Sequence, residues 1–369
     1  MLYTEIFKII EGGLDKNKDK VQKYSALLAE KLKDDGENQL ADRVLKLLHK
    51  RSIHPVYMDE FCVKPIDQDS RLDMVDIYFA PDTEHIQEII LPDITQRKIK
   101  QFIDVSQNKN KLFAAGIESL DSLLLYGPPG CGKTSVARYV SGELHLPLVT
   151  ARLDGLVSSL LGSTAKNIRK VFDYAKERPC ILFLDEFDAI AKARADQHEV
   201  GELKRVVNSL LQNIDEFLSS ETNILIAATN HEKLLDPAVW RRFNSVIEVP
   251  KPSKTEIDNL VQIFICPMKS DIDSKRMEKI VELLVGLSPS DIKTICLNSK
   301  RSAVLNNKDT VSFGSFLYEF QLFNNNLSNS TLEVVKSLYQ NGVSQDQIHK
   351  ILDISVRQVR KLLHKDGDD

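Results

Sequence analysis

The chain has 369 residues and a net charge of −4, and 42% of its residues are hydrophobic. This composition is typical of a globular protein with two or three domains, and the small net charge excludes a general attraction to nucleic acid. No stretch reaches the roughly twenty apolar residues that cross a bilayer, and glutamates interrupt the first residues where a signal peptide needs an apolar core. We therefore expect a cytoplasmic protein without a membrane partner.

The cysteines give no sign of a structural crosslink. There are five of them, without a Cys-x-x-Cys pair and without histidines at the spacing of zinc ligands, so neither a disulfide framework nor a zinc site is expected. They are Cys62, Cys131, Cys180, Cys266 and Cys296.

The first ninety residues carry no chemical motif. Apolar residues from Val21 to Lys50 recur every three or four positions on both sides of Gly36, which predicts a helical hairpin. The segment from Ser52 to Leu91 is interrupted by prolines and is less periodic, and we interpret it as a connector. Residues 1–90 are therefore expected to form an N-terminal helical module.

Between Ser122 and Pro250 the sequence changes to short, nearly unbroken apolar runs separated by amphipathic helical stretches. Strands buried on both faces have this pattern, so we predict an α/β fold in which helices flank a parallel sheet. The predicted strands are "SLLLY", "LPLVTA", "CILFLD", "NILIAAT" and "SVIEV". After Pro252 the helical period returns and continues to about Phe323.

A phosphate-binding loop follows the first of these strands. The run "GPPGCGKT", Gly127 to Thr134, fits the Walker A pattern and opens a helix, a context that favours a nucleotide site over an ordinary glycine-rich turn. Lys133 is expected to reach the terminal phosphates of ATP and Thr134 to bind Mg²⁺. We interpret Cys131 as a tolerated small residue and not as a redox switch. The expected nucleotide-binding residues are Gly127, Pro128, Pro129, Gly130, Cys131, Gly132, Lys133, Thr134, Ser135 and Asp185.

Two further strands end in polar residues that suit hydrolysis. "CILFLDEFD" ends with Asp185, expected at the shell of the magnesium ion, and with Glu186, expected to act as the base on the attacking water. "NILIAATN" ends at Asn230, whose amide is expected to orient the same water. Together these residues predict ATP hydrolysis and not binding alone.

Two adjacent arginines, Arg241 and Arg242, follow the only tryptophan of the chain in "LDPAVWRRF". Most arginine pairs lie in water at the surface. A guanidinium nevertheless forks onto phosphate oxygens and stabilises the charge of a phosphoryl-transfer transition state.

The order of these motifs resembles the AAA+ ATPases, and within them the classical AAA clade, from about Pro92 to Phe323. The resemblance implies a P-loop NTPase subdomain at 91–250, a helical lid at 251–325 and assembly into a homo-oligomer, most often a hexameric ring. It also implies that Arg241 and Arg242 are arginine fingers, which reach the nucleotide of the neighbouring subunit. The family usually separates the two arginines by proline and glycine, so either could be the finger here.

Two other segments resemble elements of this family. "GLSPSDI", Gly286 to Ile292, is similar to the lid element that replaces a sensor-two arginine in the classical clade. "SSLLGSTAKNIRKVF" is similar to the segment that carries the first pore loop, with Leu160, Leu161 and Gly162 where an aromatic residue, an aliphatic residue and glycine usually stand. The two leucines are expected either to contact a threaded client or to lie in the core.

The last segment, residues 326–369, reads as a linker and three short helices with a turn at "DIS". It resembles a helix-turn-helix of the resolvase and sigma-factor type. The last predicted helix carries the basic residues Arg357, Arg360, Lys361 and Lys365. DNA contact through residues 331–365, a protein-docking role and a merely solvated face are the alternatives.

We therefore expect an ATP-hydrolysing ring that remodels a protein client or delivers it to a separate effector such as a protease, because the chain has no His-Glu-x-x-His or Gly-x-Ser-x-Gly motif of its own. In this family the N-terminal module is the usual site of adaptor or substrate recognition. The alternative is a DNA-acting regulator whose ATP-driven assembly organises helix-turn-helix contacts. A scaffold that hydrolyses too slowly to do work is a third reading, and Glu186 argues against it.

Overall fold

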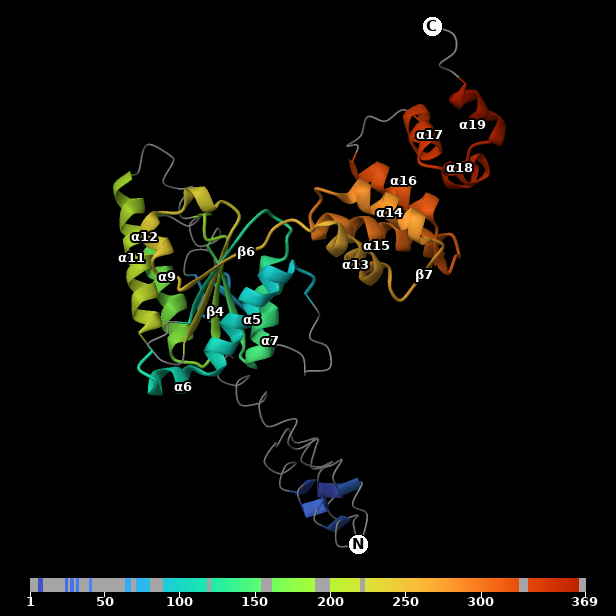
Figure 1. The fold of residues 1–369 in the computed structure, drawn as a ribbon. Helices are drawn as coiled ribbons and strands as arrows, with labels where there is room; N and C mark the ends of the chain where they lie inside the picture. The colour runs from blue at the N-terminus through green and yellow to red at the C-terminus, as the bar shows by residue number, and fades with distance from the viewer. Residues whose placement is uncertain are drawn as a thin grey trace. The chain divides into compact units, whose positions relative to one another are not determined.

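The computed structural model describes residues 64–67, 71–79, 89–117, 121–153, 161–189, 200–219, 223–324 and 331–364, together with short pieces between residues 6 and 41. The chain divides into two compact units, Met1–Ile66 and Asp67–Asp369 (Figure 1). The described residues from 6 to 41 are helical, with Ala29, Leu32 and Ala41 buried. Most of the predicted hairpin lies outside the described residues and stays a prediction.

The second unit contains a six-stranded sheet in the order β1-β3-β4-β5-β2-β6. The strands β2 to β6 pair with one another in parallel, and the side chains of β5 are all buried. These five strands confirm the predicted parallel sheet. Their bounds are Ser122–Tyr126 for β2, Leu148–Arg152 for β3, Ile181–Asp185 for β4, Ile224–Thr229 for β5 and Ser245–Glu248 for β6.

The strand β1 (Val75–Tyr78) lies in the segment that we interpreted as a connector, so that interpretation is wrong for these residues. It pairs antiparallel with β3 at the edge of the sheet, with Tyr78 opposite Leu148. Four residues with one exposed side chain are too few for a clear hydrophobic period, which explains the miss. The preceding loop is fixed by a buried hydrogen bond of 3.1 Å from Asn167 Nδ2 to Asp67 Oδ1.

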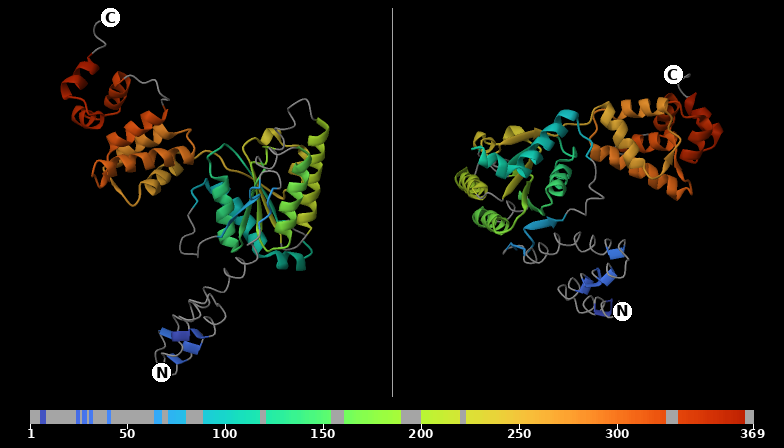
Figure 2. Two further views of the ribbon diagram at one scale, coloured as in Figure 1. Left: turned by 180° about the vertical axis from the view of Figure 1, so that it is seen from behind. Right: turned by 60° about the horizontal axis from the view of Figure 1, so that its bottom comes forward.

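Helices cover both faces of the sheet, as Figures 1 and 2 show. On one face, α5 (Asp93–Gln107) and α7 (Lys133–Leu144) bury apolar side chains against β2. On the other face lie α9 (Leu161–Lys176) and α11 (Val200–Leu218), joined by an edge-to-face contact of Phe172 and Phe217. A short helix, α6 (Lys109–Ala114), follows α5. No helix within the described ranges combines the length and the apolar character that a bilayer crossing needs.

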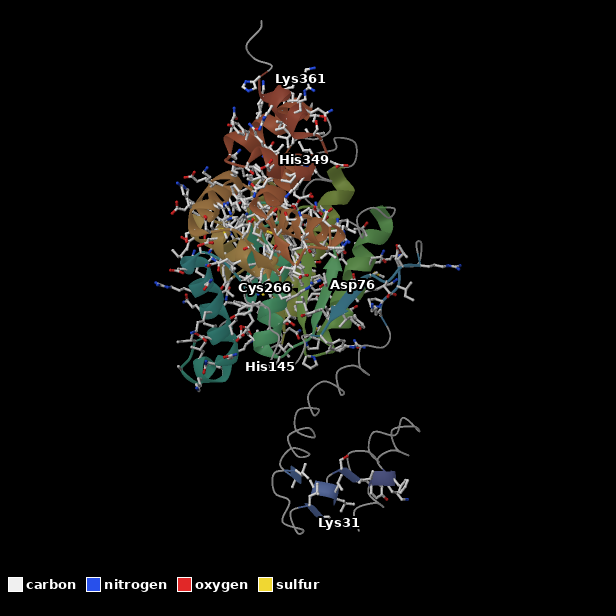
Figure 3. All side chains as sticks on the ribbon, turned by 90° about the vertical axis from the view of Figure 1, so that its right-hand side faces the viewer. Lys31, Asp76, His145, Cys266, His349 and Lys361 are labelled. Atoms are coloured by element: carbon white, nitrogen blue, oxygen red, sulfur yellow. The ribbon has the colours of Figure 1, made fainter. Side chains whose placement is uncertain are left out.

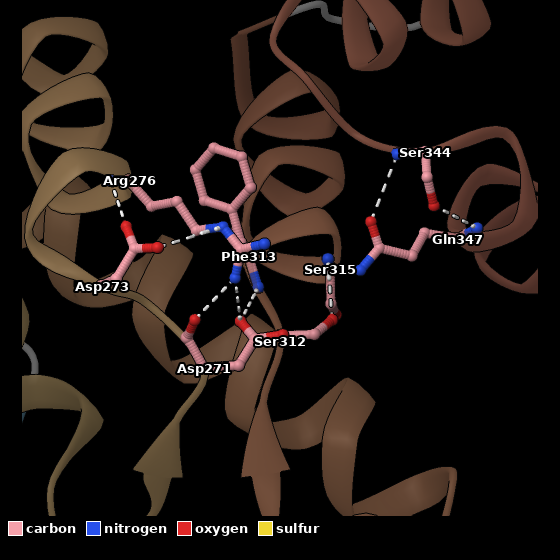
Figure 4. Close-up of polar contacts among 8 residues, drawn as sticks. All are labelled: Asp271, Asp273, Arg276, Ser312, Phe313, Ser315, Ser344 and Gln347. Carbon is pink, nitrogen blue, oxygen red and sulfur yellow. Dashed lines mark hydrogen bonds and ion pairs between the residues drawn. The ribbon is translucent and has the colours of Figure 1, made fainter.

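The predicted lid consists of four helices and a short parallel ladder of two strands, which was not predicted. The ladder joins β7 (Lys269–Ser270) to β8 (Thr310–Val311). Next to it, the carboxylate of Asp271 accepts a hydrogen bond of 2.7 Å from the backbone N–H of Phe313 (Figure 4). The helices are α13 (Lys254–Ile265), α14 (Ser274–Leu284), α15 (Pro289–Leu305) and α16 (Phe313–Asn324).

The three predicted C-terminal helices are present as α17 (Thr331–Gln340), α18 (Gln345–Leu352) and α19 (Val356–Leu363). Asp353 takes a left-handed conformation with φ of +51° and ends α18 at the predicted turn. These helices share one hydrophobic core with the lid. A Cβ atom added to Gly314 of α16 would lie 2.8 Å from Cδ1 of Ile351 and 3.1 Å from Cγ1 of Val343. Lys365 and most of the predicted linker lie outside the described residues.

Candidate functional site

The predicted site residues that follow or end strands β2, β4 and β5 come together at one edge of the sheet, whereas Arg241 and Arg242 do not line the cavity there. The strands β4, β5 and β2 are consecutive neighbours and run parallel, so their carboxyl ends lie side by side. The P-loop follows β2, Asp185 ends β4, and Asn230 follows β5. Ligands of open α/β sheets bind at this edge, and a cavity lies here.

Glycine is required at several positions of the P-loop. Gly127, Gly130 and Gly132 have φ values of +144°, +74° and +98°, which L-residues rarely adopt. A Cβ atom at Gly127 would collide with the carbonyl oxygen of Val249, and one at Gly130 would lie 2.6 Å from Oγ of Ser288. The loop therefore passes close to its neighbours and leads into the N-terminus of α7, where backbone N–H groups favour an anion.

Lys133 is buried within the loop that it serves. Its ammonium group donates hydrogen bonds of 2.8 Å to the carbonyl oxygen of Gly127 and 2.9 Å to that of Pro128. Burial lowers the pKa of Lys133 from its ordinary value, and the nearby Asp185 and Asp188 oppose this shift. A phosphate bound here would add negative charge to that of Asp185 and Asp188 and would further stabilise the charged form of Lys133. The buried ammonium group is therefore suited to binding phosphate.

Two oxygen donors suited to Mg²⁺ lie in contact. Oγ1 of Thr134 donates a hydrogen bond of 3.1 Å to Oδ2 of Asp185, whose Oδ1 accepts one of 2.9 Å from the backbone N–H of Glu186. Among the described residues no cluster of three or more His, Cys, Asp or Glu side chains could hold a metal ion. The hydroxyl of Thr134 and the carboxylate of Asp185 suit Mg²⁺, which is usually bound through one or two protein ligands together with phosphates and water.

Glu186 and Asn230 both line the cavity, and the backbone of Asn230 is held by a carboxylate that the sequence motifs did not single out. Glu186 has a φ of +52°, an uncommon conformation for a residue with a side chain. Buried Asp188 accepts hydrogen bonds of 3.0 Å from the hydroxyl of Thr229 and 3.1 Å from the backbone N–H of Asn230. Asp188 therefore ties the end of β5 to the loop after β4. The sequence did contain a signal for Asp188, because it is the last residue of the acidic run "DEFD" that supplies Asp185 and Glu186.

The cavity has a volume of about 600 Å³, which suits a nucleotide. One part is lined by the P-loop, Asp185, Glu186 and Asn230, and another by apolar side chains of the lid and of the segment before α5. The backbone N–H of Ser290 donates a hydrogen bond of 3.2 Å to the carbonyl oxygen of Gly130, which joins the lid to the P-loop. The apolar lining could not be recognised in the sequence, because apolar residues form no motif. This lining includes Ile89, Ile90, Leu260, Ile263 and Phe264.

The two arginines differ in their surroundings, although the sequence could not separate them. Both follow the one-turn helix α12 (Pro237–Trp240). Arg242 forks onto the carboxylate of Asp215 through Nε at 3.1 Å and Nη2 at 3.2 Å, and its Nη1 donates to the carbonyl of Ala238. The side chain of Arg241 is exposed and forms no hydrogen bond or ion pair with the described residues. Neither arginine is among the described residues that line the cavity.

Three other predicted site features have different outcomes. Burial raises the pKa of the Cys131 thiol, so the structure gives no support for a reactive thiolate in the P-loop. Leu160 lies outside the described residues. Leu161 and Gly162 begin α9, but their side chains are not described. The pore-loop interpretation therefore stays a prediction.

Comparison with known proteins gives matches over this part of the chain. The model of the family described as "ATPase family associated with various cellular activities (AAA)" matches residues 123–251. The uncharacterized AAA family ATPase y4kL of Sinorhizobium fredii is 36% identical over 229 residues, which are 62% of this chain and 68% of that protein. Proteasome-activating nucleotidase 1 of Haloferax volcanii is 30% identical over 277 residues, 73% of this chain and 68% of the relative. The proteasome-activating nucleotidase of Methanopyrus kandleri is 32% identical over 263 residues, 69% of this chain and 59% of the relative.

Proposed function

The chain belongs to the AAA family of ATPases and hydrolyses ATP with Mg²⁺ as its cofactor, and we propose that its copies form a ring that remodels a protein client or delivers it to an effector such as a protease. The proposal of a ring is supported by one observation: Arg241 is exposed and is not among the described residues that line the chain's own cavity. A cation in that place can complete the site of another copy.

Within one copy, we assign the chemical steps to the residues at the edge of the sheet. Lys133 and the N–H groups of the P-loop bind and orient the phosphates, and Thr134 and Asp185 hold Mg²⁺. Mg²⁺, when bound, would neutralise the negative charge that develops on the phosphates. Glu186 takes a proton from the attacking water, and Asn230 holds that water between the base and the γ-phosphate.

Arg241 is our candidate for the arginine finger. The side chain of an arginine finger must extend beyond its own subunit and bind the phosphate oxygens at the neighbouring site, where it stabilises the charge of the transition state. Arg242 is engaged by Asp215 and by the carbonyl of Ala238, so it is held on its own subunit. We therefore assign Arg242 to fixing α12 and Arg241 to reaching the neighbour, in a ring that we expect to be hexameric.

The proposal of a protein client and a separate effector is based on the names of the relatives and on the domain organisation. Two relatives are named as activators of proteasomes, which favours a protein client and a protease partner for this chain. We propose that the part of the predicted N-terminal module that precedes β1 recruits the client, that residues 91–250 together with β1 form the ATPase subdomain, that residues 251–325 form its lid, and that Leu160 to Gly162 contact the client. The chain would act in the cytoplasm.

The test is the steady-state rate of phosphate release by the full chain alone, with an unfolded polypeptide and with duplex DNA, at physiological salt. The proposal predicts stimulation by the polypeptide that is lost when Leu160 and Leu161 are both changed to serine. Equal rates in all three conditions, or stimulation by DNA alone, would contradict a protein-remodelling role.

The second candidate is a DNA-acting regulator, and the charge of α19 favours it. Arg357, Arg360 and Lys361 are exposed, whereas Val359 is buried; Lys361 is labelled on the C-terminal helices in Figure 3. A basic face on the last helix of such a module fits the phosphates of DNA. Changing Arg357 and Lys361 to glutamate should then weaken duplex binding, whereas two exposed lysines of the lid, Lys275 and Lys308, changed likewise should not.

A further inference from the structure

The segment that carries Arg241 cannot hold its own position. The helix α12 has only four residues, and the carboxylate of Asp236 caps it by accepting a hydrogen bond of 2.9 Å from the N–H of Ala238. A single turn has little intrinsic stability. The place of Arg241 is therefore set by the side chains on either side of it.

Two of these side chains are aromatic, and both pack against residues that adjoin the chain's own ATP site in the sequence. The rings of Trp240 and Tyr126 meet edge to face, with centroids 5.9 Å apart and an angle of 71°. The rings of Phe243 and Phe187 meet in the same manner at 6.1 Å and 89°. Tyr126 directly precedes the P-loop, and Phe187 directly follows Glu186. The residues before and after the arginine pair thus both pack on direct sequence neighbours of the P-loop and of Glu186.

The contact with Tyr126 lies next to the two carbonyl groups that hold the lysine of the P-loop. Lys133 donates hydrogen bonds to the carbonyl oxygens of Gly127 and Pro128, the two residues after Tyr126. Phosphates that enter the loop compete for this ammonium group and draw it away from those carbonyls. The backbone next to the Tyr126 ring then loses a partner on which its conformation depends. Trp240 packs on that ring, and Arg241 follows Trp240.

We infer that Trp240 is a positioning residue for Arg241, and that its contact with Tyr126 makes the finger presented to the neighbouring copy depend on whether the chain's own site holds ATP. The inference rests on the proposed role of Arg241. An edge-to-face aromatic pair is worth enough to change an equilibrium by about threefold to tenfold. The effect needs an aromatic ring at position 240, so phenylalanine should preserve it and leucine should not.

The experiment mixes two kinds of full-length subunit. The receiver is Arg241→Ala, which keeps its P-loop and base but supplies no finger. The donor is either Glu186→Gln, which binds ATP without hydrolysing it, or Lys133→Ala, which lacks the lysine that binds the phosphates. Phosphate release then comes from receiver sites completed by a donor's Arg241. We expect the two donors to support rates that differ by about threefold or more.

The same donors with Trp240→Leu should support equal rates, and donors with Trp240→Phe should restore the difference. Equal rates with the two original donors would overturn the inference while leaving the finger role of Arg241 intact. No phosphate release with either donor would overturn the role of Arg241, and this inference with it. The two failures are therefore distinguishable.

The tryptophan also provides a direct readout, because it is the only one in the chain. ATP added to Glu186→Gln should change the emission of Trp240, and ATP added to Lys133→Ala should leave it unchanged. A Tyr126→Leu substitution in the Glu186→Gln background should abolish the response, whereas Tyr126→Phe should keep it. An emission that does not respond to ATP in Glu186→Gln would overturn the inference, since the ring contact would then be unaffected by the nucleotide.

Discussion

The ATP site and the helical part after it are held together by different forces. At the ATP site, polar and charged groups at the ends of parallel strands hold one another at hydrogen-bond distance, as Thr134 and Asp185 do. In the lid and the C-terminal helices, one apolar core runs through both, and α16 approaches α18 closely at Gly314. A substitution at the first region should therefore change the chemistry with little effect on folding. A substitution at the second should change stability before it changes chemistry.

The largest expected effect is that of removing Arg241, the proposed finger. An arginine finger is worth about 10³-fold or more in the rate of hydrolysis, so Arg241→Ala should lower phosphate release by about that factor while ATP binding stays the same. Arg242→Ala should cost about tenfold or less, because a partly exposed ion pair with Asp215 contributes at most about 1 kcal/mol. The rate of phosphate release at saturating ATP measures the effect of each of the two substitutions on hydrolysis. An equal loss in the two variants would contradict the different roles of the arginines.

Replacing the base comes next. Glu186→Gln keeps the size of the side chain and removes its ability to take a proton, so hydrolysis should fall by about 10²-fold to 10⁴-fold. The affinity for ATP, measured with a fluorescent nucleotide, should remain within a factor of about two, because Lys133 and the P-loop are unchanged. Glu177→Gln, at an exposed position of the loop after α9, is the matched control and should leave both quantities unaltered. A Glu186→Gln variant with wild-type turnover would show that another group takes the proton.

The third prediction concerns the helical part. Gly314→Leu would drive a side chain into Ile351 and Val343 and should lower the free energy of unfolding by about 1–3 kcal/mol. Gln340→Leu, at an exposed position of α17, should change it by less than about 0.5 kcal/mol. Urea unfolding followed by circular dichroism measures both. If Gly314→Leu unfolds like the wild-type chain, the C-terminal helices do not pack on the lid as described.

The smallest effect on activity is expected from the buried thiols. Burial raises the pKa of Cys180 and of Cys296 to about 12, which disfavours their thiolates. The folded state therefore holds these protons more tightly than the unfolded state does. The resulting contribution to the free energy of unfolding is complete below the ordinary pKa of 9.0 and is lost as the pH rises from there toward 12. At pH 8 an alkylating reagent should therefore modify exposed Cys266 and leave these two thiols intact until the protein unfolds. Peptide mapping after brief alkylation tests this, and early modification of Cys180 would contradict its burial.

The sequence predicted the chemistry of the ATP site more fully than its packing. Walker residues such as Lys133 and Glu186 can be recognised because each step needs one residue type at one place in a strand order. Hydrolysis was predicted for this reason, whereas the parallel sheet was predicted from the unbroken apolar runs of its strands. The apolar wall of the cavity, which includes Phe264, was not found, because many apolar residues could serve there.

Where a feature depends on distant contacts, the sequence carried less information. The edge strand β1 is too short to show a period, and its pairing with β3 depends on the fold. The different surroundings of Arg241 and Arg242 depend on Asp215, which lies 27 residues before Arg242. The shared core of the lid and the C-terminal helices joins segments that a polar linker separates in the sequence. None of these relations leaves a local pattern.

The most direct test of the account is whether one copy of the chain completes the ATP site of another. Arg241→Ala and Glu186→Gln subunits should each be nearly inactive alone, the first for lack of a finger and the second for lack of a base. When they are mixed in equal amounts, an intact base in one copy meets an intact Arg241 in its neighbour, and phosphate release should rise well above the sum of the separate rates. A mixture that is no more active than that sum would contradict a site shared between copies.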